Sequence, residues 1–141
     1  MKHIEAIAAR FATPFVRWFA LLAICAAYLQ GGLNKAIDFD GALAEMNHFG
    51  LKPAALFAIA TIALELGASI MILTGFYRWL GALSLAGFTL LATFMANRFW
   101  EMGPPERIMV ANSFFEHLGL IGAFLLVAWH DLNSYSGKHL R

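Results

Sequence analysis

Three ionisable side chains lie inside long apolar stretches of the sequence, where a charge is costly and chemistry is possible. Glu65 lies midway along the apolar run 53–76, and Glu116 and His117 lie inside the run 108–129. A charged residue at the centre of a membrane-spanning helix costs about 2.5–3.5 kcal/mol on insertion scales, so such residues usually face the bundle interior and mark a function. They are therefore the first candidates for a ligand or proton site.

Two basic residues are the expected partners of these carboxyl groups. Lys35 and Arg98 each follow an apolar run, and both side chains are long enough to reach along a helix. At about 1.5 Å per residue, Glu116 lies roughly 12 Å from the start of its helix and Glu65 roughly 18 Å. We therefore expect the cations to reach Glu116 more readily than Glu65. A carboxyl group without a close cation favours its neutral form, which makes Glu65 the candidate proton-accepting group.

Asn112 completes the candidate set. It precedes Glu116 by four residues and shares its helix face, whereas His117 lies about 100° away on the same helix. The alternative is that the glutamates are hydrogen-bonding anchors between helices and bind nothing else. The predicted ligand-binding residues are Lys35, Glu65, Arg98, Asn112, Glu116 and His117.

Metal and thiol chemistry within one chain has little support in the sequence. Cys25 is the single cysteine, so an internal disulfide, a Cys-x-x-Cys pair and a cysteine metal cage are excluded. A haem held by two histidines needs both at membrane depth, and His117 alone qualifies. We expect no cofactor bound covalently or through metal ligands.

The elements that must position these residues are membrane helices. Hydrophobic residues make up 60% of the 141 residues and charged residues 13%, against about 45–50% and 25% in ordinary soluble domains. Each long apolar run has about the 20 residues needed to cross the bilayer. The chain is predicted to be an all-α membrane protein, a single domain (1–141) forming an antiparallel four-helix bundle with spans at 15–33, 53–76, 79–96 and 108–129.

Two shorter segments are predicted to be interfacial helices. Apolar residues recur at helical spacing in 3–12 and in 39–49, and Asp38 and Gly50 bound the second segment. Six Lys and Arg residues fall on the side of the chain termini and four on the other, which predicts that both termini are cytoplasmic. A net charge of +1 without a basic cluster excludes a nucleic-acid binder.

Four short motifs resemble the DoxX family over roughly residues 15–129. They are Gly31–Lys35, Phe49–Pro53, Leu64–Gly67 and Thr74–Arg78. The resemblance implies a bacterial inner-membrane four-helix bundle. It also implies a link to membrane oxidoreductases, because the relatives linked to such enzymes include a small subunit of thiosulfate:quinone oxidoreductase. The sequence around Glu116 and His117 departs from the Lys-Asn-Leu ending of many members.

The leading hypothesis is a membrane subunit or accessory of a quinone-linked oxidoreductase system. The quinone head group would enter between helices near Lys35, Glu65, Asn112 and Glu116. A protein partner or a second copy would lie beside the chain in the bilayer, and the electron carrier would belong to the partner. The alternatives are a proton-coupled carrier of a small lipophilic or acidic solute, with Glu65 as its proton switch, and a structural scaffold subunit.

Overall fold

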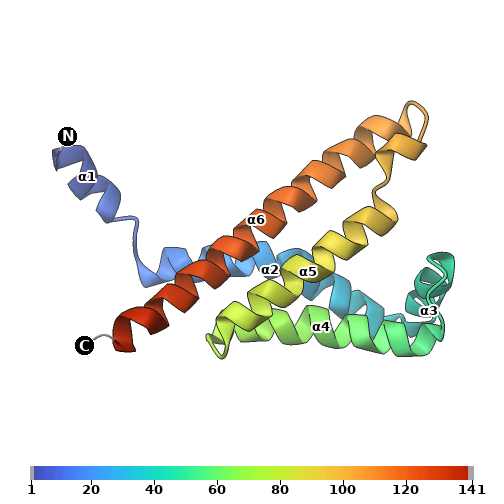
Figure 1. The fold of residues 1–141 in the computed structure, drawn as a ribbon, viewed down its shortest axis with the longest axis horizontal. Coiled ribbons are helices and arrows are strands. Elements are labelled where there is room, and N and C mark those ends of the chain that lie inside the picture. Colours follow the sequence, from blue (N-terminus) through green and yellow to red (C-terminus); the bar gives the residue numbers. More distant parts are fainter. Residues whose placement is uncertain (1, 140–141) are drawn as a thin grey trace.

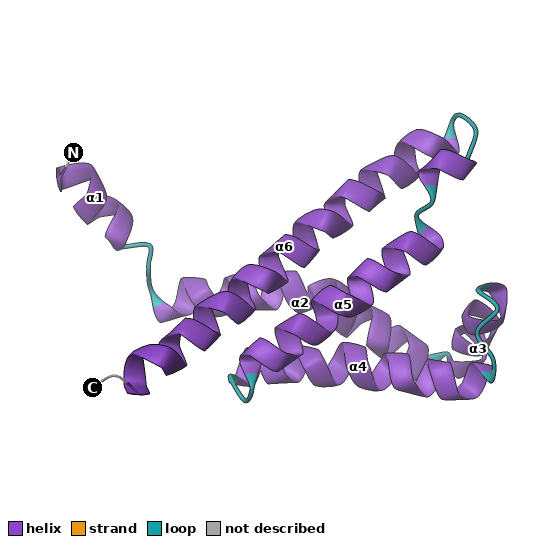
Figure 2. Cartoon of the chain, in the orientation of Figure 1, coloured by secondary structure: helices purple, strands orange, loops and turns teal. Residues whose placement is uncertain are grey.

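The computed structural model describes residues 2–139, which form helices joined by short loops with no strand among them (Figures 1 and 2). In chain order the helices are α1 (Lys2–Ala9), α2 (Pro14–Ile37), α3 (Phe39–His48), α4 (Ala54–Thr74), α5 (Arg78–Ala96), the 3-10 helix η1 (Phe99–Glu101) and α6 (Glu106–His139).

The prediction of an all-α membrane bundle is confirmed. Among residues 2–139, four helices are long and apolar enough to cross a bilayer, namely α2, α4, α5 joined to η1, and α6. Two of these helices extend beyond the predicted spans by more than the usual uncertainty of helix boundaries. The helix α2 continues to Ile37 instead of ending at 33, and α6 continues to His139 instead of ending at 129. Glycine within a helix costs only about 1 kcal/mol, so the pair Gly31-Gly32 does not stop α2.

One residue both ends α2 and begins α3. The backbone N–H of Asp38 donates to the Asn34 carbonyl oxygen at 2.8 Å, which closes the last turn of α2. The Asp38 carboxylate accepts from the Gly41 N–H at 2.9 Å, which satisfies a free donor in the first turn of α3. The two helices therefore join at a fixed corner.

The helices pack in a chain of neighbours. The helix α4 packs against α2, α3 and α5, and α5 also packs against α6, whereas α2 and α6 barely touch. Figure 1 shows α5 leaving the end of α4 at an angle, α6 crossing α2, and α3 beside the beginning of α4. Ala42 and Met46 of α3 bury against Ala58, so α3 covers the first turns of α4.

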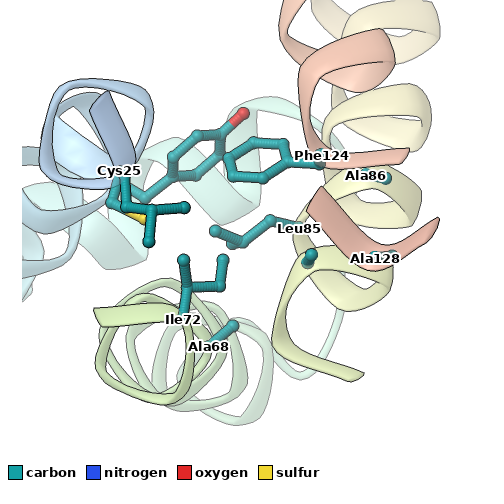
Figure 3. Close-up of a cluster of buried hydrophobic side chains, with 10 residues drawn as sticks. Cys25, Ala68, Ile72, Leu85, Ala86, Phe124 and Ala128 are labelled. Carbon is teal, nitrogen blue, oxygen red and sulfur yellow. The ribbon is translucent and has the colours of Figure 1, made fainter. Parts of the chain in front are cut away.

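The core lies where α2, α4, α5 and α6 meet (Figure 3). Each of these helices contributes at least one fully buried side chain, among them Cys25, Ile72, Leu85 and Phe124. The ring of Tyr28 stands edge-on to Phe124, with 5.4 Å between ring centroids, and its hydroxyl group hydrogen-bonds to a threonine of α5. All four spans therefore share one core.

Close contact between α4 and α5 depends on Gly81. A Cβ atom at this position would lie 2.7 Å from the Ala68 carbonyl oxygen, which is backbone and cannot turn aside. We expect Gly81→Ala to lower the free energy of unfolding by about 1–3 kcal/mol, the usual range for overpacking. Unfolding in mixed detergent micelles measures this. The matched control is Gly87→Ala on the same helix, where a Cβ atom meets nothing within 4 Å. Equal losses at both positions would contradict the packing explanation.

Candidate functional site

Lys35 lies between two carboxylates from different helices. Its Nζ atom lies 3.5 Å from Oε2 of Glu65 on α4 and 3.8 Å from Oε2 of Glu45 on α3. The Lys35 and Glu65 side chains are 16% and 7% exposed, whereas the Glu45 side chain is 44% exposed. We call these three residues the Lys35 cluster. It is a partly buried ion pair, in which Glu65 is buried and Lys35 partly accessible, with one further carboxylate at its outer edge.

The helix ends explain why Lys35 meets Glu65. Glu65 follows the first residue of α4 by eleven residues, which places it roughly 16 Å along that helix. Because α3 occupies the first turns of α4, the end of α2 lies against the middle of α4. Gly32 permits this contact, since a Cβ atom there would lie 2.8 Å from the Leu66 side chain. At Gly31 a Cβ atom would lie 3.5 Å from both carboxylate oxygens of Glu65, so Gly31 faces the ion pair.

The predicted pairing was wrong. Lys35 contacts Glu65 and not Glu116, so Glu65 has the close cation that the sequence analysis did not give it. This pairing depends on the continuation of α2 to Ile37 and on the packing of α3 against α4, which local sequence patterns do not indicate. The proton-accepting role of Glu65 stays a prediction, now as part of an ion pair.

The other predicted site residues do not join the cluster. Asn112 and Glu116 are exposed on the outer face of α6. His117 is half-buried and faces α5, where its Nδ1 atom lies 3.0 Å from the hydroxyl oxygen of the buried Thr93. Arg98 pairs with Glu101 at 3.1 Å in the α5–α6 connection, where both side chains are about half exposed. The structure therefore brings together two of the six predicted residues.

Sequence reasoning missed a second ion pair at the other end of the bundle. Arg78, the first residue of α5, lies 3.8 Å from Asp131 of α6, and the side chains are 16% and 9% exposed. The same carboxylate accepts the Trp79 backbone N–H at 3.1 Å, and Nε of Arg78 donates to the Ile72 carbonyl oxygen at 2.8 Å. The signal that could have revealed this pair is Asp131, an acidic residue two positions after the end of the predicted span 108–129.

Sequence reasoning also missed Glu45. It lies on the predicted helix 39–49, but nothing in the sequence showed which face of that helix meets Lys35.

The Lys35 cluster opens onto a groove between α2 and α3. The groove has a volume of about 430 Å³, and Lys35 and Glu45 line it together with Asn34, Asp38 and Gly41. Glu65 lies behind Lys35 and is not among the lining residues. A molecule in the groove would therefore meet the Lys35 ammonium group and the Glu45 carboxylate first.

This arrangement suits an oxygen-bearing ligand. The Lys35 ammonium group has three N–H donors, and hydrogen bonds to a charged group are stronger than those between neutral groups. A carbonyl or carboxylate oxygen in the groove can accept one of these donors while Glu65 keeps another. Among the residues that the structure describes, no group of three or more His, Cys, Asp or Glu side chains could hold a metal ion.

Comparison with known proteins agrees with this architecture. The inner membrane protein YphA of Escherichia coli (strain K12) is 27% identical over 117 residues, which cover 83% of this chain and 84% of the relative. No solved structure matches the chain. The sequence model of the DoxX family matches residues 11–98, a stretch that contains α2 to α5 and the whole Lys35 cluster. Since this match covers more than half of the sequence, the chain belongs to the DoxX family.

Proposed function

We propose that this multi-pass inner-membrane protein is a subunit or accessory of a quinone-linked oxidoreductase system, and that the Lys35 cluster binds the quinone head group. The observation that carries the proposal is the mostly buried Lys35–Glu65 pair beside an open groove. Burying two charges costs desolvation free energy that their attraction often fails to recover, so the pair is poorly explained by stability alone. Intramembrane charges of this kind are usually functional.

The groove offers the chemistry that a quinone needs. Reduction of a quinone to a quinol takes two electrons and two protons. In this proposal a partner protein supplies the electrons, Lys35 donates a hydrogen bond to a carbonyl oxygen of the head group, and Glu45 at the groove wall exchanges protons. Glu65 holds the Lys35 side chain in place through their ion pair.

The outer face of α6 supports a subunit over a protein that acts alone. Asn112 and Glu116 lie on this face, roughly 9 and 15 Å from the start of the helix, where hydrocarbon would otherwise surround them. A neighbouring helix with polar groups would satisfy both side chains. This position favours a protein partner against α6.

Purification with native lipids, followed by mass spectrometry of the extracted lipids, tests the proposal. The wild-type protein is expected to retain a quinone. We expect the double substitution Lys35→Met with Glu65→Leu, which removes the ammonium donor together with its counter-charge, to weaken retention about tenfold or more, the usual effect of losing a charge-assisted hydrogen bond. The matched control is Arg98→Met with Glu101→Leu, which removes an ion pair whose side chains are about half exposed.

Two results would contradict the proposal. One is the absence of quinone from the wild-type protein after purification with its native lipids. The other is uptake of an acidic solute into proteoliposomes that fails in Glu65→Gln, which would indicate a proton-coupled carrier instead.

A further inference from the structure

Two adjoining grooves lie at the end of the bundle near the chain termini, and Arg17, Leu21 and Arg78 line both of them. The first groove extends under the loop before α2, past Thr13 and Trp18. The second passes between α2 and α6. We call the two together the Arg17 groove. It lies far from the Lys35 cluster, since Arg17 and Lys35 are separated by roughly 27 Å along α2.

The groove exists because α2 and α6 do not pack along their length. Both helices reach the common core, but they barely touch each other, and α6 crosses α2 at an angle (Figure 1). The side chains on the facing sides therefore remain accessible from the bilayer. Ile24 of α2 and Leu126 and Val127 of α6 line this part of the groove with aliphatic surface.

The polar end of the groove is basic. Arg17 and His130 are exposed, and no carboxylate is among the residues that line either part. The Arg78 guanidinium group is mostly buried at the groove wall, where Asp131 and the Ile72 carbonyl oxygen fix its orientation. A charged head next to an aliphatic channel about 10 Å long, from Arg17 to Ile24, matches the two parts of a phospholipid.

We propose that the Arg17 groove binds an anionic phospholipid, with the phosphate held by Arg17 and Arg78 and one acyl chain lying along Leu21, Ile24 and Val127. Guanidinium groups match the geometry of phosphate oxygens and can bind them through two parallel hydrogen bonds. Basic pockets between membrane helices are known binding places for anionic head groups. The Trp18 ring, exposed beside Arg17, suits the head-group level of the bilayer.

The experiment compares lipids bound to the full-length protein by native mass spectrometry from mixed micelles. Phosphatidylglycerol is expected to remain bound to the wild-type protein under conditions that remove phosphatidylcholine. We expect Arg17→Gln to reduce bound phosphatidylglycerol about tenfold or more, and Arg17→Lys to reduce it less, because lysine keeps the charge but not the paired donors. The matched control is Arg10→Gln, which removes an exposed basic residue that does not line the groove.

Three outcomes would overturn the proposal. They are equal retention of the two lipids, an equal loss in Arg10→Gln and Arg17→Gln, and competition by millimolar inorganic phosphate that displaces the lipid completely. The last result would show that the site recognises phosphate alone. Quinone retention in the Arg17→Gln protein is expected to be unchanged, so failure here is distinguishable from failure of the proposed function.

Discussion

The single substitution Lys35→Met is expected to lower the free energy of unfolding by about 3–5 kcal/mol, whereas the double substitution Lys35→Met with Glu65→Leu is expected to cost much less. Removing Lys35 leaves the buried Glu65 carboxylate, only 7% exposed, without its cation. Removing both charges together also removes their desolvation cost, and an apolar pair of similar volume can replace them. Breaking the pair is therefore expected to destabilise the protein strongly, whereas replacing both residues with apolar ones is expected to destabilise it little.

Unfolding in mixed micelles of mild and denaturing detergent measures the four proteins of this double-mutant cycle. The surface pair Arg98–Glu101 is the matched control, because both side chains are about half exposed, and its removal should cost no more than about 1 kcal/mol. If the double substitution destabilised the protein by the sum of the single ones, the ion-pair explanation would fail. A stable double mutant that no longer retains quinone would separate the role in binding from the role in folding.

The second large effect is expected at Asp131. Asp131→Leu removes the partner of the mostly buried Arg78 and the acceptor of the Trp79 backbone N–H, so we expect a loss of about 3–5 kcal/mol. Asp131→Asn keeps an oxygen for the N–H and loses only the charge, so its cost should be intermediate. This carboxylate ties the last third of α6 to the start of α5.

Limited proteolysis of the segment after Asp131, together with the unfolding free energy, tests that tie. Faster cleavage is expected in Asp131→Leu, because α6 would detach from α5 at this end. Asn133→Leu alters an exposed neighbour on the same helix and should change the stability by no more than about 0.5 kcal/mol. Unchanged cleavage in Asp131→Leu would show that core packing alone holds α6.

The four long helices could be predicted from the sequence because each apolar run has the length of the bilayer core. The face that each helix turns toward the bundle interior could not be predicted in this way. The helices α4 and α6 are apolar on most faces, so hydrophobic periodicity gives no direction for Glu65 or Glu116. Both glutamates have the same local pattern, an acidic residue in an apolar run, yet one is buried and the other is exposed. The contacts of neighbouring helices decide between them.

The partners within the site depended on one long-range feature, the place of α3. Its sequence predicts a helix between Asp38 and Gly50, and such a helix is present. It packs on Ala58 and covers the first turns of α4, while the end of α2 lies against the middle of α4, where Lys35 meets Glu65. Residue types therefore identified Lys35 and Glu65, whereas the pairing required the three-dimensional arrangement of three helices.

The outward position of Asn112 and Glu116 also has a consequence for synthesis in the cell. A charged side chain near the middle of a span makes transfer of that helix from the translocon to lipid less favourable by about 2.5–3.5 kcal/mol. If a neighbouring subunit covers this face of α6, the newly made protein is at its least stable in the bilayer before that subunit arrives. We expect copies made in excess to be degraded, so that the cellular amount of this protein follows the supply of its partner.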